Sequence, residues 1–337
     1  MKYILNIINF TISDEIYFKK NIKYIIKKIM FILILKILLT MIKQKKNTFK
    51  GVAMCVIAKN ENLDINEFIN YYKKLGINKI YLYDNNDIFG ENFYAILKKD
   101  IKSKFVEIIN IRGKNLIQNY AYNDCYKKHL NDYSWFIIVD VDEYLYIKND
   151  VSLYNFLKDK KFENCNNILI NHKMYGDSDL LYYDKRPLYQ RFTKNFKYKN
   201  FMKSIVRGGL IYAKMWLHKS LNISNYCDSE GNNIVPRFSS TKKLNIKNAE
   251  IRHYFTKTIG EYYLKLLRGW PDRKKSFRDL HSFIDFRIRN FFTLNKITKE
   301  KIEIIYPLLV NKKLLNILLE KLNKTESHKY LNEIVFR

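Results

Sequence analysis

Three carboxylates follow an apolar run in the segment WFIIVDVDEYL, residues 135 to 145. The run leads directly into Asp140, Asp142 and Glu143. A carboxylate that is buried without a partner is costly, so such a cluster requires a cation, a cap or water beside it. Alternate residues of an extended chain project to the same side, so Asp140 and Asp142 can face one ligand together. Mg²⁺ and Mn²⁺ prefer oxygen ligands and often bridge carboxylates to substrate phosphates, so the spacing predicts a metal site. The simpler alternative is that Asp142 and Glu143 only cap the turn after the strand.

The elements that would position these carboxylates alternate along the chain. Apolar runs of strand length and segments of helical periodicity follow one another from residue 51. Strands are expected at 51–58, 79–84, 104–111 and 135–140, with helices at 63–75, 92–99, 115–130 and 152–159. Such alternation predicts an α/β fold with a mostly parallel sheet and helices on both faces.

Three of these strands end in polar residues, namely AKNE (58–61), YDNND (83–87) and DVDE (140–143). In an open α/β sheet, ligands bind outside the carboxyl ends of the strands, where the strand order reverses. With a strand order of 3-2-1-4, that crevice lies between the first and the fourth strand. The three polar ends would then surround one ligand.

The pattern loosens beyond a fifth apolar segment at 167–176, and residues 177–250 are expected to form short strands and loops. Thr258 and Glu261 form a capping-box pattern before a helix that should end near Gly269. The last 60 or so residues are helical and rich in Lys. We therefore predict an N-terminal segment at 1–48, a catalytic domain at 49–275 and a helical extension at 276–337.

Four segments together resemble known enzymes: MCVIAKNENLDINEFINYYKKLGINKIYLYDNN, WFIIVDVDEYL, KSIVR and HYFTKTIGEYYLKLLRG. In this order they resemble the family 2-like and family 92-like glycosyltransferases of the GT-A (Rossmann-like) fold, over about residues 51–270. The resemblance implies transfer of a hexosyl group, with inversion, from a nucleotide-sugar donor, and we expect this donor to be UDP-linked. The acceptor is expected to be a glycan or a lipid-linked molecule.

The resemblance also implies roles for individual residues. Asp140 and Asp142 correspond to the DxD motif, which would hold Mn²⁺ or Mg²⁺ on the donor diphosphate. The residues that would contact the nucleotide are Ala58, Lys59, Asn60 and Glu61 in the first-strand loop, Asp84 after the second strand, and Gln118 and Asn123 on the third helix.

Further candidates follow from the chemistry of the transfer. The sugar leaves as a nucleoside diphosphate, so basic side chains can stabilise the growing negative charge; the candidates are Lys203, Arg207 and Lys257. His253 is the candidate third metal ligand, with His218 as its competitor.

Inversion needs a general base, and Asp177, with Asp179 as the second choice, is the candidate. Both residues depart from the glycine-serine loop that the resembling families often carry at this place.

The chain is strongly basic, with a formal net charge of +28 from 61 Lys and Arg against 33 Asp and Glu. The excess either attracts phosphate-bearing partners or reflects a Lys-rich, solvated surface. The apolar stretch 29–42 is shorter than the roughly 20 residues of a spanning helix, and Lys36 interrupts it. We expect a basic amphipathic helix on an anionic membrane surface or packed against the body, with a tilted anchor as the alternative.

The four cysteines, Cys55, Cys125, Cys165 and Cys227, are widely spaced and include no CxxC pair. This spacing is typical of neither a zinc site nor a disulfide framework, so a reducing compartment is expected. Together with the N-terminal segment, it predicts a cytoplasmic enzyme attached to the inner face of a membrane.

Two other function classes share parts of the pattern. A phosphohydrolase of the haloacid-dehalogenase type also carries DxD after an apolar strand, but on the first strand of its core, and Tyr144 stands where it normally has Thr or Val. A nucleic-acid-binding protein would explain the charge and the 27 Tyr and 22 Phe. The aromatic residues follow strand and helix periodicity, however, and no recognised binding motif is present. We expect no nucleic-acid partner.

Overall fold

The computed structural model describes residues 27–34, 36, 49–194, 196–267, 277–309, 314 and 316–318. The chain divides into two compact units, Met1–Phe49 and Lys50–Arg337. In the first unit, residues 27–34 are helical and solvent-exposed. No helix among the described residues is long and apolar enough to cross a bilayer. Much of the segment 29–42 lies outside the described residues, so its membrane-surface role stays a prediction.

The parallel half of the sheet has the predicted order. It consists of β1 (Val52–Ala58), β2 (Lys79–Asp84), β3 (Val106–Asn110) and β4 (Trp135–Ile138), arranged β3-β2-β1-β4. All three pairings are parallel. β1 is buried along nearly its whole length, as its continuous apolar sequence indicates for a strand inside a parallel sheet. The prediction of a mixed α/β, mostly parallel sheet of the GT-A type is confirmed.

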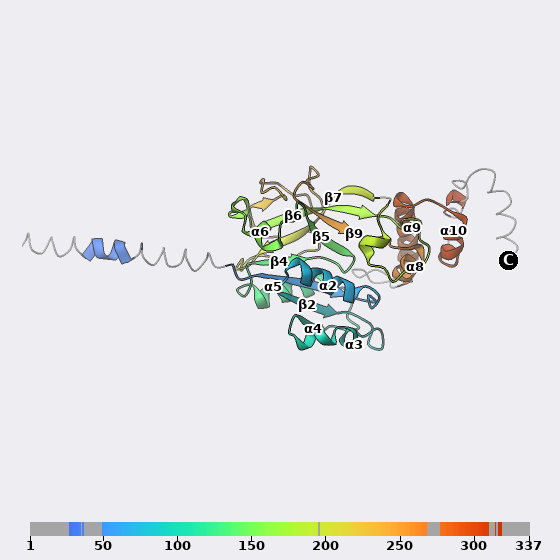
Figure 1. Cartoon of the computed structure of the whole chain (residues 1–337), viewed down its shortest axis with the longest axis horizontal. Coiled ribbons are helices and arrows are strands. Elements are labelled where there is room, and N and C mark those ends of the chain that lie inside the picture. The colour runs from blue at the N-terminus through green and yellow to red at the C-terminus, as the bar shows by residue number, and fades with distance from the viewer. Residues whose placement is uncertain are drawn as a thin grey trace, which may run out of the picture. The chain divides into compact units, whose positions relative to one another are not determined.

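The second half of the chain continues the same sheet beyond β4. β7 (Phe196–Arg207) pairs antiparallel with β4, and β6 (Asn167–Tyr175), β9 (Ala249–His253) and β5 (Glu143–Ile147) follow in that spatial order. The two-residue strand β8 (Tyr226–Cys227) pairs with β6. β5 is a finding that periodicity did not predict, since the DVDE turn leads at once into a second strand. Figure 1 shows β5, β6, β7 and β9 lying together above the parallel strands.

The helices of the α/β half match the predicted ones, with shorter bounds. They are α2 (Ile65–Leu75), α3 (Phe93–Ile96), α4 (Lys98–Lys102), α5 (Gln118–His129) and α6 (Leu153–Lys158). The single turn α7 (Leu188–Arg191) lies in the region where only short strands and loops were predicted. α2 ends at Gly76, whose φ of 102° is the left-handed conformation that glycine adopts at helix ends. The predicted helix at 92–99 instead breaks at Leu97 into α3 and α4.

Three helices in the C-terminal part of the described chain share one core. α8 (Ile259–Leu267), α9 (Phe277–Leu294) and α10 (Lys299–Ile305) pack through apolar side chains that include Tyr262, Phe291 and Ile302, and Figure 1 shows them grouped together. The predicted capping box is present, because the Thr258 hydroxyl accepts a hydrogen bond from the Glu261 amide at 3.1 Å. The predicted end of this helix near Gly269 and the boundary at 275/276 lie outside the described residues.

The cysteines correct one expectation. Cys55 pairs with Cys125 and Cys165 pairs with Cys227 as disulfides, so the chain does carry a disulfide framework. The partners are 70 and 62 residues apart, which is why local spacing did not reveal them. The first disulfide joins β1 to α5 inside the core. Disulfides persist in oxidising compartments, so the argument from cysteine spacing for a reducing one no longer holds.

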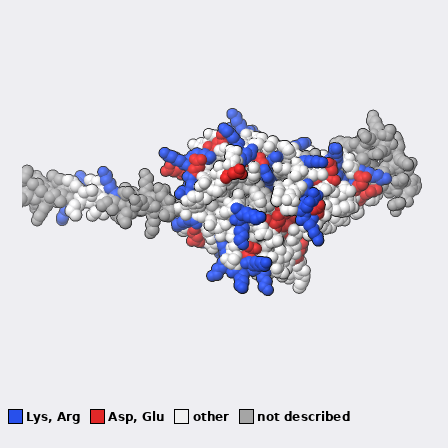
Figure 2. All heavy atoms as spheres, viewed as in Figure 1, with Lys and Arg blue, Asp and Glu red and all other residues white. Residues whose placement is uncertain are grey.

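The basic side chains are spread over much of the visible face, with acidic side chains between them (Figure 2).

Candidate active site

The DVD carboxylates lie at the carboxyl end of β4, beside the end of β1. The register pairs Val52 with Trp135 and Cys55 with Ile138, so the two strands run side by side and end at the same edge. The first-strand loop and the DVD turn therefore flank one crevice at the point where strand order reverses. This is the arrangement that the polar strand ends predicted.

Asp140 receives partners from both sides. Its Oδ1 accepts hydrogen bonds from Tyr122 at 3.0 Å and Gln118 at 3.2 Å, and the Lys203 ammonium lies 2.8 Å from its Oδ2. Burial opposes ionisation, but Lys203 outweighs it and holds the pKa of Asp140 below its ordinary value. The side chain is 34% exposed, which makes it the most accessible carboxylate of the cluster. Gln118 thus reaches the predicted site, and Tyr122, one turn further along α5, is a contact that we did not predict.

Asp142 is buried and ion-paired. The Lys265 ammonium, from α8, contacts its Oδ2, and the His253 Nε2 lies 3.4 Å from its Oδ1. Burial disfavours the charged form, but Lys265 and His253 hold the pKa of Asp142 well below its usual range. The structure therefore brings His253 to Asp142, as predicted. Lys265 was missed because it lies on a distant helix.

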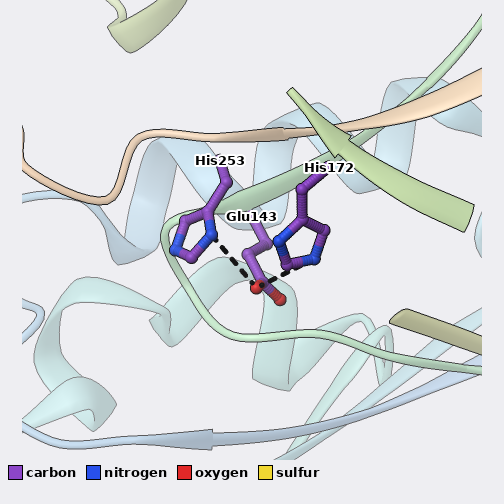
Figure 3. A group of neighbouring side chains, drawn as sticks. All are labelled: Glu143, His172 and His253. Carbon is purple, nitrogen blue, oxygen red and sulfur yellow. Dashed lines mark ion pairs between the residues drawn. The ribbon is translucent and has the colours of Figure 1, made fainter. Parts of the chain in front are cut away.

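Glu143 is the most deeply buried of the three carboxylates. Its Oε2 lies 3.0 Å from the Lys203 ammonium and accepts a hydrogen bond of 3.0 Å from the Asp140 amide. Its Oε1 faces two imidazoles, 3.6 Å from His172 Nε2 and 3.5 Å from His253 Nδ1 (Figure 3). Burial raises the pKa of Glu143. Burial also holds the pKa of His172 well below its ordinary value, so this imidazole is neutral.

The first-strand loop is fixed by polar contacts. Asn60 has a positive φ of 53°, and its amide donates to the Asn86 Oδ1 at 2.7 Å. Lys59 pairs with Asp87 at 2.6 Å. Lys257 lies 3.4 Å from Glu61, which ties the loop to the segment before α8. The loop is therefore held beside the crevice in a defined conformation, with the Ala58 carbonyl accepting from the amide of Asn85.

A second group of buried charged side chains is linked to this loop through Lys257. The Lys257 ammonium also contacts Asp64, and Arg191 lies 3.3 Å from Asp64 and 3.0 Å from Glu261. Lys257 was a candidate for contacting the diphosphate. Its ammonium is already compensated by two carboxylates, so this geometry indicates that it joins α8 to the first-strand loop.

Asp84 and Asn123 have structural partners. The Asp84 carboxylate is 1% exposed and pairs with Arg112 at 3.0 Å, and Arg112 also donates to backbone carbonyls of the loop after β2. Asn123 exchanges hydrogen bonds with the backbone of Met215 at 2.8 and 2.9 Å. In this structure both side chains shape the loops around the crevice, and their predicted contacts with the nucleotide stay predictions.

Arg207 and His218, two further candidates from the sequence, contact backbone carbonyls in this structure. Arg207 pairs with Trp135, the first residue of β4, so it lies at the opposite end of that strand from the DVD turn. Its guanidinium donates to backbone carbonyls, including that of Cys165 at 2.7 Å. Arg207 therefore has a structural role here, and the geometry gives its predicted donor contact no support. His218 contacts the Met202 carbonyl at 3.3 Å through Nδ1.

The two candidate bases differ sharply in exposure. Asp177 is 0% exposed, its Oδ2 lies 2.6 Å from the Lys301 ammonium, and its amide donates to Asn295. Burial raises the pKa of Asp177. Asp179 is exposed on the same loop, and its amide donates to Asp177 Oδ1 at 3.0 Å. Asp179 is therefore the more accessible of the two, and Asp177 links β6 to the C-terminal helices.

The residues present fit a divalent cation. Asp140 and Asp142 supply hard oxygen ligands, and ammonium groups already lie against both carboxylates, which shows that positive charge is stabilised there. A second set of ligand atoms, from Glu143, His172 and His253, lies within 4.8 Å of one another.

Comparisons with known proteins found similar solved structures and one matching family model. Among solved structures, TarS of S. aureus (1–349, in complex with UDP-GlcNAc) has a TM-score of 0.37 and 10% identity over 78% of this chain and 82% of that one. GalNAc-T7 with UDP, GalNAc and Mn²⁺ has a TM-score of 0.32 and 13% identity over 78% and 55%. A longer TarS structure has a TM-score of 0.34 and 12% identity over 82% of this chain, which spans half of that one. No curated protein matches the chain. The model of glycosyltransferase family 92 matches residues 50–301, which is about three quarters of the sequence and includes every part of the crevice described above. The chain is therefore a glycosyltransferase and belongs to family 92.

Proposed function

We propose that this glycosyltransferase moves a hexosyl group from a UDP-sugar to a glycan or lipid-linked acceptor, with inversion at the anomeric carbon. The observation that carries the proposal is the position of Asp140 and Asp142 at the carboxyl end of β4, beside the first-strand loop. Ligands of α/β sheets bind at this edge. Family membership supports the sugar transfer, and the carboxylate pair supports a donor that brings phosphates and a cation.

The side chains of the crevice suit the departure of a nucleoside diphosphate. Asp140 and Asp142 would hold Mn²⁺ or Mg²⁺, which when bound acts as a Lewis acid on the leaving phosphate. The His253 imidazole lies beside this pair, with its Nε2 3.4 Å from Asp142 Oδ1. Lys203 and Lys265 lie against the same carboxylates, so their ammonium groups are positioned to neutralise charge beside the diphosphate.

The acceptor side of the reaction requires a base that solvent and acceptor can reach. Asp179 meets this condition better than Asp177, because its side chain is exposed and forms no ion pair with the described residues, whereas Asp177 is buried against Lys301. We propose that Asp179 takes the proton of the acceptor hydroxyl. Asp177 then holds the loop that carries Asp179, through the hydrogen bond from the Asp179 amide.

We also propose that the basic N-terminal segment brings the enzyme to an anionic membrane surface, where lipid-linked acceptors lie. Each Lys near such a surface contributes about 1 kcal/mol at modest ionic strength. The disulfides favour an oxidising compartment over the cytoplasm expected from the cysteine spacing. Flotation of the full chain with anionic liposomes, weakened by salt and absent with neutral liposomes, tests this proposal. Equal flotation with both, resistant to salt and carbonate, would show an inserted anchor instead.

Calorimetry of UDP binding tests the donor site. UDP should bind more tightly with Mn²⁺ than with EDTA, and Asp142→Asn should remove that gain. Asp132→Asn is the matched control, since this exposed carboxylate lies just before the opposite end of β4 and should leave the gain intact. Equal UDP affinity with and without metal in the parent protein would contradict a metal-assisted donor site.

A screen of nucleotide sugars for hydrolysis without acceptor then identifies the donor. Turnover of a UDP-sugar is the expected result. Hydrolysis of simple phosphate esters with no effect of UDP would favour the phosphohydrolase alternative, and salt-sensitive binding of random oligonucleotides would favour a nucleic-acid-binding protein.

A further inference from the structure

Three potential ligand atoms converge on one face of neighbouring strands. Glu143, the first residue of β5, lies directly opposite His253, the last residue of β9, in the antiparallel register. On the other side of β9, His253 pairs with Met174 of β6, and His172 lies two residues before it. Residues that pair across strands, or are two apart along one strand, project to the same face. The sheet therefore brings Glu143, His172 and His253 together, as Figure 3 shows.

The facing atoms of this triad lack ordinary partners. His172 Nε2 and His253 Nδ1 are buried and accept or donate no hydrogen bond among the described residues. They lie 3.6 and 3.5 Å from Glu143 Oε1. A buried polar atom without a partner is costly, and in native structures it commonly indicates an ion or water that completes the site. Two such atoms that both face one carboxylate oxygen favour an ion.

We infer that Glu143 Oε1, His172 Nε2 and His253 Nδ1 form a binding site for a divalent transition metal. Two imidazole nitrogens and one carboxylate oxygen are a ligand set that suits Zn²⁺ or Mn²⁺ far better than Mg²⁺, which prefers oxygen alone. With bonds of about 2.0–2.2 Å in tetrahedral geometry, ligand atoms lie about 3.4 Å apart. Two of the spacings already match this value, and the third, within 4.8 Å, shortens when the ion binds.

The surroundings orient two of the three ligands, Glu143 and His253. Lys203 and the Asp140 amide occupy the Oε2 of Glu143, which leaves Oε1 for the ion. Asp142 Oδ1 lies 3.4 Å from His253 Nε2 and can accept a hydrogen bond from its N–H, which leaves Nδ1 as the ligand atom. A carboxylate behind a metal-bound imidazole is the usual way in which proteins fix its tautomer. These contacts orient the Glu143 and His253 side chains toward the inferred ion.

The inferred ion is distinct from the ion on the donor diphosphate and needs no nucleotide. It would give His253 the role of a triad ligand, with Asp140 and Asp142 alone on the protein side of the donor ion. Because Glu143 follows Asp142 directly, an ion in the triad would also fix the turn that aims both aspartates into the crevice.

Metal binding to the full-length protein without nucleotide tests this inference. After dialysis against chelator, the protein is titrated with Zn²⁺ alone and with Mn²⁺ alone, and bound metal is measured by equilibrium dialysis and elemental analysis. We expect about one ion per chain, with affinity lowered at least ~10-fold in His172→Gln and in Glu143→Gln. His129→Gln, a part-buried imidazole at the end of α5 that pairs with Asp132, is the matched control and should bind like the parent.

Pulsed electron paramagnetic resonance of the Mn²⁺-loaded parent protein gives a second test, which does not depend on whether any variant folds. Coupling to two imidazole nitrogens is the expected result, since the DVD aspartates supply only oxygen. A folded parent that binds no ion without UDP would overturn the inference. So would an ion coupled to no nitrogen, or one whose affinity is unchanged in folded His172→Gln and Glu143→Gln. Because UDP is absent, these outcomes are independent of the proposed transfer reaction.

Discussion

Lys203 offers the sharpest test of how the acidic cluster is stabilised. Its ammonium is 2% exposed and lies 2.8 Å from Asp140 Oδ2 and 3.0 Å from Glu143 Oε2. The change Lys203→Met keeps most of the side-chain volume and removes the charge. Removing one partner of a buried ion pair costs about 3–5 kcal/mol, because the other charge stays buried without compensation. Solvent reaches Asp140, so we expect the lower end, about 3 kcal/mol, carried mainly by Glu143.

Urea unfolding followed by tryptophan fluorescence at pH 7, with chelator present, measures this loss. The free energy of unfolding should fall by about 3 kcal/mol, which corresponds to a drop in Tm of roughly 6–12 °C. Lys199→Met is the matched control, since Lys199 is an exposed lysine of the same strand and its loss should change stability by less than about 0.5 kcal/mol.

Two further comparisons separate charge from packing. Glu143 has a pKa raised by burial, and loss of Lys203 raises it further, so the penalty exists above that pKa and shrinks as the pH falls through it. The double variant Lys203→Met with Glu143→Gln should recover part of the lost stability. The reasoning is refuted if Lys203→Met is as stable as Lys199→Met at pH 7, or if its deficit is equally large at pH 5 and pH 8.

Asp179→Asn should lower the transfer rate while leaving UDP affinity intact, and a parent-like rate would contradict the role of Asp179 as the base. Asp177→Asn should instead lower the free energy of unfolding by about 3 kcal/mol, because it removes the ion pair with Lys301. Reduction of the two disulfides should lower the free energy of unfolding by about 2–4 kcal/mol each. Mass spectrometry of alkylated, unreduced protein should find no free thiol. Alkylation of all four cysteines in protein from its native compartment would contradict the disulfides. Because the folded pKa of Asp142 is depressed, its ionised form stabilises the protein above about pH 4, and this contribution is lost as the pH falls through the folded pKa. Acid unfolding of Asp142→Asn should therefore be less steep than that of the parent, and an identical profile would contradict the pairing with Lys265.

The sequence alone indicated the α/β half of the molecule. Strand and helix alternate with clear periods between residues 51 and 159, and such local patterns depend on which face of each element is buried. The polar strand ends then located the crevice through a topological rule, and the register of β1 with β4 confirms that placement. The functional role of the DVD carboxylates was predictable because three acidic residues after a buried strand need a compensating cation or hydrogen-bond donor in any fold.

The strand β5 was not predictable from its residues, since EYLYI directly follows the DVDE turn and its partner β9 comes about a hundred residues later. Its position decides that Glu143 faces two imidazoles. Neither His172 nor Glu143 carries a local signal for this role, because their proximity depends on how three strands from separate parts of the chain align.

The partners of the charged groups were likewise decided by tertiary structure. Lys265 meets Asp142 across 123 residues of sequence, and Lys301 reaches Asp177 from the C-terminal helices. In so Lys-rich a chain, sequence cannot single out these lysines, since every lysine has the same chemistry until folding excludes water around it. The disulfides follow the same reasoning: cysteines 70 and 62 residues apart become neighbours only when the sheet and its helices have packed. Periodicity thus determined which segments fold into which elements, while desolvation and long-range packing determined which of their polar atoms meet and with what charge.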